Sequence, residues 1–275
     1  MTNETDQWQL PIGVFDSGLG GLTVVAEMQR CMPNEDIIYL GDSARVPYGT
    51  RSPDTVRRYA WNCSRFLVDR GLKMLVVACN TVSALAIGAL SEGLEVPVLG
   101  VIRAGARAAM KHPGVGRIGV IGTAGTVQSG AYVRELSQLA RDVQVFQNPA
   151  PLLVPLVEEG WIVGDVPHLA VRRYIAPLVE KRVEVLLLGC THYPVLRPVI
   201  EEEMRALNST AVVVDSATSM AREVYDALAE QNLLSRRNDN GTLQCCVTDL
   251  PGNFGESAGR FLGRSVGHVE KVDIS

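Results

Sequence analysis

Two cysteines occupy matching positions in two similar stretches of the chain. Cys79 follows an apolar run in residues 75–81 (LVVACNT), and Cys190 follows another in residues 186–192 (LLLGCTH). This pattern places each cysteine between a buried strand and a helix, where the free N–H groups and the dipole of the helix start favour a thiolate. We therefore expect the pKa of each thiol to fall from about 8.5 toward 7.

Two thiols that face each other could form a disulfide, bind a soft metal, or act as acid and base on opposite faces of one carbon atom. In the third case one thiolate removes a proton while the other thiol returns a proton from the opposite side, which inverts the carbon centre. A duplicated chain suits this chemistry, and we favour it. A free cysteine is more often a small buried hydrophobe. We interpret Cys31, Cys63, Cys245 and Cys246, which lack such a context, as core or surface residues.

Polar residues after other apolar runs are further candidates for the same site. They include Asp16, Ser17, Asp42 and His192. An Asp or Ser in such a place could simply cap a helix, and a lone histidine could satisfy a hydrogen bond in the core. Their convergence at the carboxyl ends of strands, where open parallel sheets bind ligands, favours a functional site.

The elements that must position these residues are short apolar runs that alternate with longer segments of helical period. This alternation is typical of parallel sheets covered by helices on both faces. The uncharged stretch 74–91 is too short for a membrane span and is expected to be a strand that runs into a helix. The expected strands span residues 11–15, 36–40, 73–78, 96–100, 117–121, 143–146, 185–189 and 211–215, with a tail of a strand, a short helix and a strand at 242–247, 254–262 and 268–274.

The first four strands recur in the same order later in the chain. Residues 12–18 align with 118–124, and residues 75–81 align with 186–192. The repeat predicts an α/β fold of two similar parallel-sheet domains, related by a pseudo-twofold axis, with the active site in the cleft between them. We assign residues 1–103 and 214–275 to the first domain, because the tail is expected to return to it. Residues 104–213 form the second.

Composition argues against several classes of protein. The net charge of −4, from 30 acidic and 26 basic side chains without a basic run, argues against a nucleic-acid partner. The first ten residues lack the apolar core of a signal peptide, so we expect a cytoplasmic protein with reduced thiols and no membrane association. Four scattered histidines and the absence of a CxxC motif give no zinc spacing, and we expect no metal.

Four motifs resemble those of the glutamate racemases, within the cofactor-independent aspartate/glutamate racemase superfamily. They are residues 15–21 (FDSGLGG), 41–49 (GDSARVPYG), 78–81 (ACNT) and 189–194 (GCTHYP). Any one of them alone is weak, but the four in this order and spacing are specific.

The resemblance implies both a reaction and a set of residues. The reaction is the interconversion of L- and D-glutamate without pyridoxal phosphate, metal or nucleotide, and it supplies D-glutamate for peptidoglycan. The catalytic acid–bases are then Cys79 and Cys190, assisted by Asp16 and His192, and the enzyme could be a homodimer. The substrate-binding residues implied are Asp16, Ser17, Asp42, Tyr48, Gly49, Asn80, Thr81, Glu158, Thr191 and His192.

Three alternatives stay open at this point. The substrate could be aspartate or a related acid, because the depth of the cleft is not visible in the sequence. The two cysteines could form a regulated disulfide in a thiol redox protein. The chain could also be a module that binds acidic metabolites between two lobes without turning them over.

Overall fold

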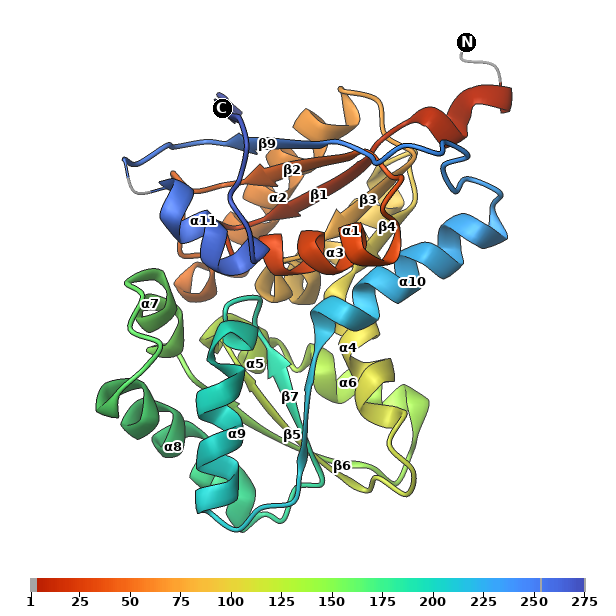
Figure 1. Ribbon diagram of the computed structural model, residues 1–275. Coiled ribbons are helices and arrows are strands. Elements are labelled where there is room, and N and C mark those ends of the chain that lie inside the picture. Colours follow the sequence, from red (N-terminus) through yellow and green to blue (C-terminus); the bar gives the residue numbers. More distant parts are fainter. Residues whose placement is uncertain (1–3, 253, 275) are drawn as a thin grey trace.

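Two parallel β-sheets, each packed between helices, form the molecule (Figure 1). The structure is a computed structural model that describes residues 4–252 and 254–274. The first sheet has the strand order β10-β9-β2-β1-β3-β4, and the second has the order β6-β5-β7-β8. We call each sheet with its helices the first and the second unit. The strands are β1 (Ile12–Asp16), β2 (Ile37–Gly41), β3 (Met74–Val77), β4 (Val98–Gly100), β5 (Arg117–Gly122), β6 (Gln144–Pro149), β7 (Val185–Gly189), β8 (Val212–Asp215), β9 (Leu243–Val247) and β10 (Val269–Lys271).

Helices or short 3₁₀ turns connect the strands, as the alternating pattern predicts. Within the described residues no helix is long and apolar enough to cross a membrane, and the uncharged stretch 74–91 is β3 followed by a helix. The helical elements are η1 (Glu4–Gln9), α1 (Leu22–Cys31), η2 (Tyr48–Thr50), α2 (Pro53–Val68), α3 (Asn80–Gly93), α4 (Val101–Met110), α5 (Ala124–Ser129), α6 (Ala131–Leu139), α7 (Leu153–Glu158), α8 (Asp165–Glu180), η3 (Tyr193–Leu196), α9 (Arg197–Ala206), α10 (Ser216–Glu230) and α11 (Phe254–Leu262).

The strand pairing reproduces the repeat seen in the sequence. The order β2-β1-β3-β4 in the first sheet corresponds to β6-β5-β7-β8 in the second. Ile12 pairs with Met74 between β1 and β3, and their counterparts Ile118 and Val185 pair between β5 and β7. The pairing register of the central strands is therefore the same, residue by residue, in both units. The predicted fold class is confirmed.

The C-terminal tail completes the first unit. Strand β9 pairs with β2, and β10 pairs with β9, all parallel. Helix α11 packs on α1, while α10 contacts both α1 and α4 and runs from one unit to the other (Figure 1). The tail thus lies on the first unit; the domain boundaries at residues 103/104 and 213/214 stay a prediction.

Burial on both faces explains why the central strands are apolar throughout. Every residue of β1, β3 and β7 is buried. Along β3, Val76 faces one hydrophobic cluster and Leu75 and Val77 face the cluster on the other side of the sheet. Helices cover both faces, so alternation of polar and apolar residues is absent. The first polar residues that can take part in chemistry therefore lie at the carboxyl ends of the central strands.

Candidate active site

One cavity of about 290 Å³ lies between the two units, and both cysteines line it. Cys79 comes from the end of β3, and Cys190 comes from the end of β7. Ten of the twelve residues singled out in the sequence line this cavity; Asp16 and Asp42 do not. The ten are Ser17, Tyr48, Gly49, Cys79, Asn80, Thr81, Glu158, Cys190, Thr191 and His192.

Cys79 caps the start of helix α3 and is almost completely buried. Its Sγ donates to Ser17 Oγ at 3.4 Å. Burial raises the pKa of the Cys79 thiol to about 12, and the nearby carboxyl of Asp16 adds to this rise, while the hydrogen bonds with Ser17 and with the N–H of Val82 oppose it. The sequence expectation of a lowered pKa is therefore wrong for Cys79, because loss of hydration outweighs the helix start. The thiol stays protonated unless a base takes its proton.

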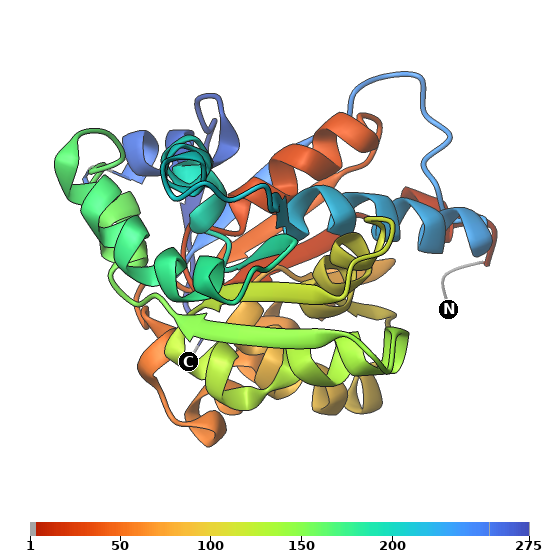
Figure 2. The ribbon, with the colours of Figure 1, turned by 90° about the horizontal axis from the view of Figure 1, so that it is seen from below.

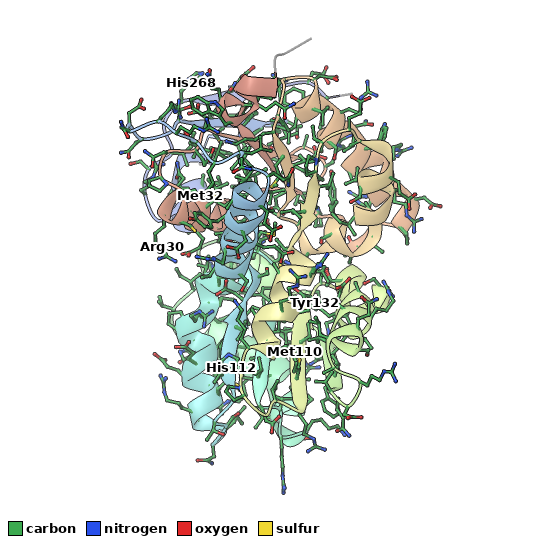
Figure 3. All side chains as sticks on the ribbon, turned by 90° about the vertical axis from the view of Figure 1, so that its right-hand side faces the viewer. Arg30, Met32, Met110, His112, Tyr132 and His268 are labelled. Atoms are coloured by element: carbon green, nitrogen blue, oxygen red, sulfur yellow. The ribbon has the colours of Figure 1, made fainter. Side chains whose placement is uncertain are left out.

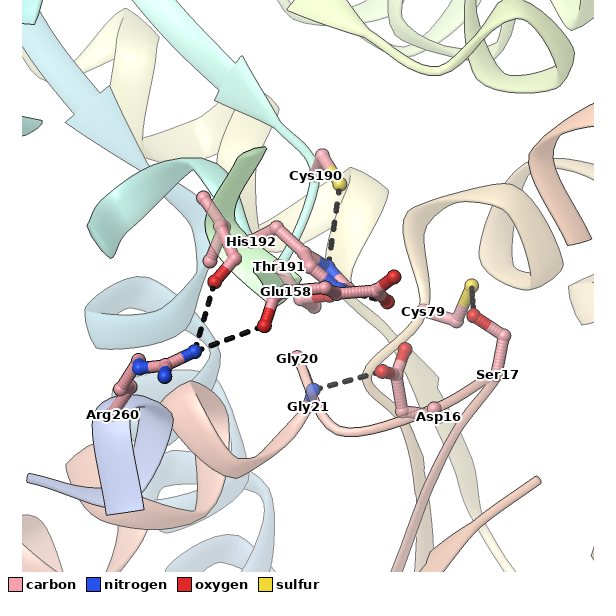
Figure 4. A network of polar contacts seen from close by, with 12 residues as sticks. Asp16, Ser17, Gly20, Gly21, Cys79, Glu158, Cys190, Thr191, His192 and Arg260 are labelled. Carbon is pink, nitrogen blue, oxygen red and sulfur yellow. Dashed lines mark hydrogen bonds and ion pairs between the residues drawn. The ribbon is translucent and has the colours of Figure 1, made fainter. Parts of the chain in front are cut away.

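Asp16 is the last residue of β1 and is fully buried beside Ser17 and Cys79 (Figure 4). Its Oδ2 accepts from the N–H of Gly21 at 2.9 Å, whereas Oδ1 has no hydrogen-bond partner among the described residues. Burial raises the pKa of Asp16, although the positive charge of His192 lowers it in part. A buried carboxyl group with a free oxygen is suited to accept a proton from a neighbour.

The second cysteine has a histidine as its neighbour. His192 Nδ1 lies 3.9 Å from Cys190 Sγ, and His192 Nε2 lies 3.1 Å from Oε1 of Glu158 (Figure 4). Burial lowers the pKa of His192, but the hydrogen bonds with Cys190 and Glu158 outweigh it and raise the pKa to about 10. At neutral pH the imidazolium form of His192 therefore lies beside Cys190.

Cys190 does not begin an α-helix, contrary to the sequence expectation. A 3₁₀ turn, η3, follows it, and α9 begins only at Arg197. The carbonyl of Cys190 accepts from Tyr193 three residues on, at 3.2 Å, because Pro194 four residues on has no N–H. Pro198 likewise cannot donate to the carbonyl of Pro194, so a regular helix from Cys190 would lack two hydrogen bonds.

Amide and hydroxyl groups line the wall around Cys79. Asn80 Oδ1 accepts from the hydroxyl of Tyr132 at 2.7 Å, and Asn80 Nδ2 has no partner among the described residues. Tyr132 belongs to α6 and lies where the two units meet (Figure 3). Thr81 Oγ1 lies 2.9 Å from Thr123 Oγ1 of the second unit. No motif in the sequence marked Tyr132, whereas Thr123 is the counterpart of Ser17 in the repeat that aligns residues 12–18 with 118–124.

Asp42 lies behind the cavity wall, although it was expected to bind substrate. It is fully buried and accepts from the hydroxyl of Tyr48. It also accepts from Arg45 Nε at 2.6 Å and from Thr248 Oγ1 of the tail at 2.8 Å. In this structure Asp42 holds Tyr48 in place and does not itself face the cavity.

Close contact of the first unit with the Cys190 segment depends on a glycine. A Cβ atom on Gly20 would lie 2.3 Å from Thr191 Oγ1 and 2.6 Å from His192 Nδ1. Thr23 Oγ1 of α1 also donates to the carbonyl of Thr191 at 3.3 Å. The sequence marked this glycine-rich turn but gave no sign that it touches the other unit.

Comparison with known proteins gives consistent matches along the chain. A family model described as Asp/Glu/Hydantoin racemase matches residues 12–224. A glutamate racemase of Geobacter metallireducens is 47% identical over 263 residues, which are 96% of each chain. A solved glutamate racemase of Francisella tularensis in complex with D-glutamate has a TM-score of 0.91 and 35% identity, with 97% of this chain and 98% of that chain covered. A glutamate racemase structure from Thermus thermophilus has a TM-score of 0.86 and 43% identity, covering 97% of this chain and 98% of that one.

Proposed function

The chain belongs to the Asp/Glu/Hydantoin racemase family, and we propose that it interconverts L- and D-glutamate with two opposed cysteine acid–bases. One observation carries this proposal: each unit of a duplicated fold contributes one buried thiol, Cys79 or Cys190, to the same cavity. The full-length similarity to glutamate racemases supports glutamate as the substrate. No cofactor is needed for this chemistry, because the two sulfur atoms supply both the base and the acid.

The proton transfers follow from the neighbours of each thiol. In one direction Asp16 receives the proton of Cys79, and the resulting thiolate takes the α-proton of the substrate. Cys190 then gives its proton to the opposite face of the α-carbon, and His192 replaces that proton. In the reverse direction neutral His192 takes the proton of Cys190, the Cys190 thiolate takes the α-proton, Cys79 gives its proton to the opposite face, and Asp16 replaces that proton. One turnover leaves both sulfur atoms protonated, with one proton gained by Asp16 and one lost by His192, and exchange with water restores these two groups.

The two carboxylates of glutamate would be held without Lys or Arg, because no described residue of the cavity wall is either. The wall offers the hydroxyl groups of Ser17, Thr81 and Thr191 and the free amide of Asn80. His192 supplies positive charge near the substrate at neutral pH. Hydrogen bonds to the α-carboxylate would stabilise the negative charge that develops when the α-proton leaves.

The first test is proton NMR of D-glutamate and then of L-glutamate with the purified protein in D₂O, together with circular dichroism of the amino acid. Racemisation predicts loss of the α-proton signal and decay of the dichroic signal to zero from both sides. Aspartate under the same conditions tests the nearest alternative substrate. A protein that exchanges no α-proton of either amino acid, and whose two thiols titrate as a disulfide couple, would contradict the proposal and favour the redox alternative.

The proposed product, D-glutamate, would enter peptidoglycan synthesis. Growth of a bacterium that requires added D-glutamate tests this role, because the chain should remove the requirement while its Cys79→Ala variant should not.

We also propose a cytoplasmic location and a homodimer. Cell fractionation and sedimentation of the purified protein test these two points.

A further inference from the structure

Helix α11 of the tail reaches the second unit at two neighbouring residues (Figures 1 and 2). Arg260 Nη1 donates to the carbonyl of Glu158 at 2.9 Å and approaches the carbonyl of Val157 at 3.5 Å. The ring of Phe261 meets the ring of His192 edge to face, with 5.0 Å between centroids. One helix of the first unit therefore contacts both members of the pair formed by Glu158 and His192.

The guanidinium group of Arg260 fits closely against the C-terminus of α7. Helix α7 has only six residues and ends at Glu158, so its last carbonyl groups need partners from outside the helix. The guanidinium supplies N–H donors there, and a positive charge is favourable at a helix C-terminus. Gly160, at a φ of +75°, leaves room for it: a Cβ atom would lie 2.9 Å from Arg260 Cζ. Glu256 Oε1 accepts from Nη2 of Arg260 at 2.7 Å and holds the guanidinium from its own helix.

We propose that Arg260 is a positioning residue for the Cys190 half of the site, because it holds the backbone of Glu158 so that this carboxylate stays at His192 Nε2 (Figure 4). The side chain of Glu158 is 39% exposed, so close packing does not fix it. Its place at the histidine depends on where its backbone is held. The catalytic meaning of this inference rests on the proposed function, whereas its geometry belongs to the protein without substrate.

The charges around His192 determine what loss of Arg260 would do. Cys190 faces the ring from its own segment, Glu158 from α7 and Asp16 from β1. Loss of the positive charge of Arg260, which leaves Glu256 unpaired, would by itself raise the pKa of the ring, so a fall in that pKa reports the movement of Glu158. When Glu158 moves away, His192 loses a negative neighbour, and its pKa falls from about 10 toward its ordinary value.

The test compares Arg260→Met and Arg260→Lys with Arg264→Ala. Arg264 is a matched control, because its Nη2 donates to Gln29 Oε1 of the first unit. The readout is the titration of His192 by NMR of ¹⁵N-histidine-labelled protein without substrate, assigned with His192→Gln. We expect Arg260→Met to lower the midpoint by about one pH unit or more and Arg260→Lys to lower it less, while Arg264→Ala leaves it unchanged.

Racemisation kinetics give a second readout. In Arg260→Met the alkaline limb of kcat should move to lower pH by the same amount, with kcat about tenfold lower and KM unchanged. An unmoved His192 midpoint in folded Arg260→Met overturns the inference, as does a loss of activity that is equal at every pH. If the Met variant does not fold, the Lys variant decides by the same midpoint. If the native protein does not racemise glutamate, the proposed function fails, while the titration still decides the role of Arg260.

Discussion

The two halves of the site share a backbone plan but differ in their charges. On the side of Cys79, a long helix begins at the thiol, and the buried carboxyl of Asp16 lies next to it. On the side of Cys190, the chain makes a 3₁₀ turn, and the protonated ring of His192 lies between the thiol and Glu158. The duplication has therefore preserved where each sulfur atom lies but not which ionisable group lies next to it.

This difference is compatible with a reversible racemisation. L- and D-glutamate have equal free energies in water, so the ratio of kcat/KM in the two directions is fixed whatever the residues on each side. Neither half has to copy the other; each has only to return its thiol to the protonation state that the next cycle needs. In the proposed mechanism Asp16, as a proton acceptor, does this for Cys79, and His192, as a cation, does it for Cys190.

Removal of either thiol should have the largest effect. Cys79→Ala and Cys190→Ala should each lower racemisation in both directions by about a thousandfold or more, because each variant lacks the group that serves one face of the carbon. Circular dichroism of glutamate measures the loss. Exchange of the α-proton in D₂O distinguishes the two halves of the site, because each variant should exchange the α-proton of a different enantiomer with retention of configuration. Substantial racemisation by Cys190→Ala would contradict the two-base mechanism.

Neutral replacements of the two assisting groups should cost about a hundredfold in kcat each, but with different pH profiles. In the native protein the rate should decline above about pH 10, where His192 loses its proton. His192→Gln should remove this alkaline limb, whereas Asp16→Asn should retain it. Initial rates from pH 7 to 11 test this contrast, and an identical limb in both variants would show that the histidine is not its source.

The free energy of unfolding should also depend on the protonation of His192. Its pKa is raised on folding from the ordinary 6.5 to about 10, so the protonated ring stabilises the native state fully below pH 6.5. This contribution is lost progressively as the pH rises from 6.5 to 10. Urea unfolding of the native protein and of His192→Gln should therefore give a free-energy difference that shrinks across this range. A difference that is constant with pH would contradict the raised pKa.

A methyl group at the contact between the halves should have a smaller effect. Gly20→Ala would press on Thr191 and His192, and we expect kcat about tenfold lower and the free energy of unfolding about 1–3 kcal/mol smaller. Gly18→Ala in the same turn is the control, since its Cβ would meet only Val46 at 3.4 Å. Equal effects of the two substitutions would argue against a specific role for the contact at Gly20.

The smallest effect is expected behind the cavity wall. Thr248→Val removes the hydroxyl that donates to Asp42, which in turn accepts from Tyr48. We expect KM to rise a few-fold and the free energy of unfolding to fall by about 1–3 kcal/mol, because a buried acceptor loses its donor. Thr248→Ser keeps the hydroxyl and should behave as the native protein. A Ser variant as impaired as the Val variant would point to the methyl group instead.

Much of the arrangement follows from local patterns in the chain. The apolar run that ends at Cys79, and its copy that ends at Cys190, predicted two similar parallel-sheet units and the meeting of both thiols at one cavity, whereas the strand order and the pairing register are known only from the structure. The expectation of a lowered pKa for Cys79 was wrong for a physical reason. The hydration of a sulfur atom depends on all the groups packed around it, whereas the local sequence indicates only the helix that follows.

Contacts between distant segments could not be read from the chain. Arg260 carries no motif, and the repeat marks Thr123 only as the counterpart of Ser17. Both residues matter because folding brings them against Glu158 and Thr81. The inward position of Asp42 likewise depends on Thr248, about two hundred residues away. Proline chemistry was visible beforehand, and the turn after Cys190 could have been predicted from Pro194 and Pro198.

The parallel pairing of β9 with β2 bears on how the chain is assembled during synthesis. Strands β5 to β8 are contiguous and can pair as soon as residue 215 has emerged from the ribosome. The first sheet has to wait, because β2 keeps an unpaired edge until residues 243–247 arrive. The unit made first is therefore finished last. A nascent chain stalled before β9 would hold a complete second sheet beside an open one, exposed to chaperones or to pairing with another chain.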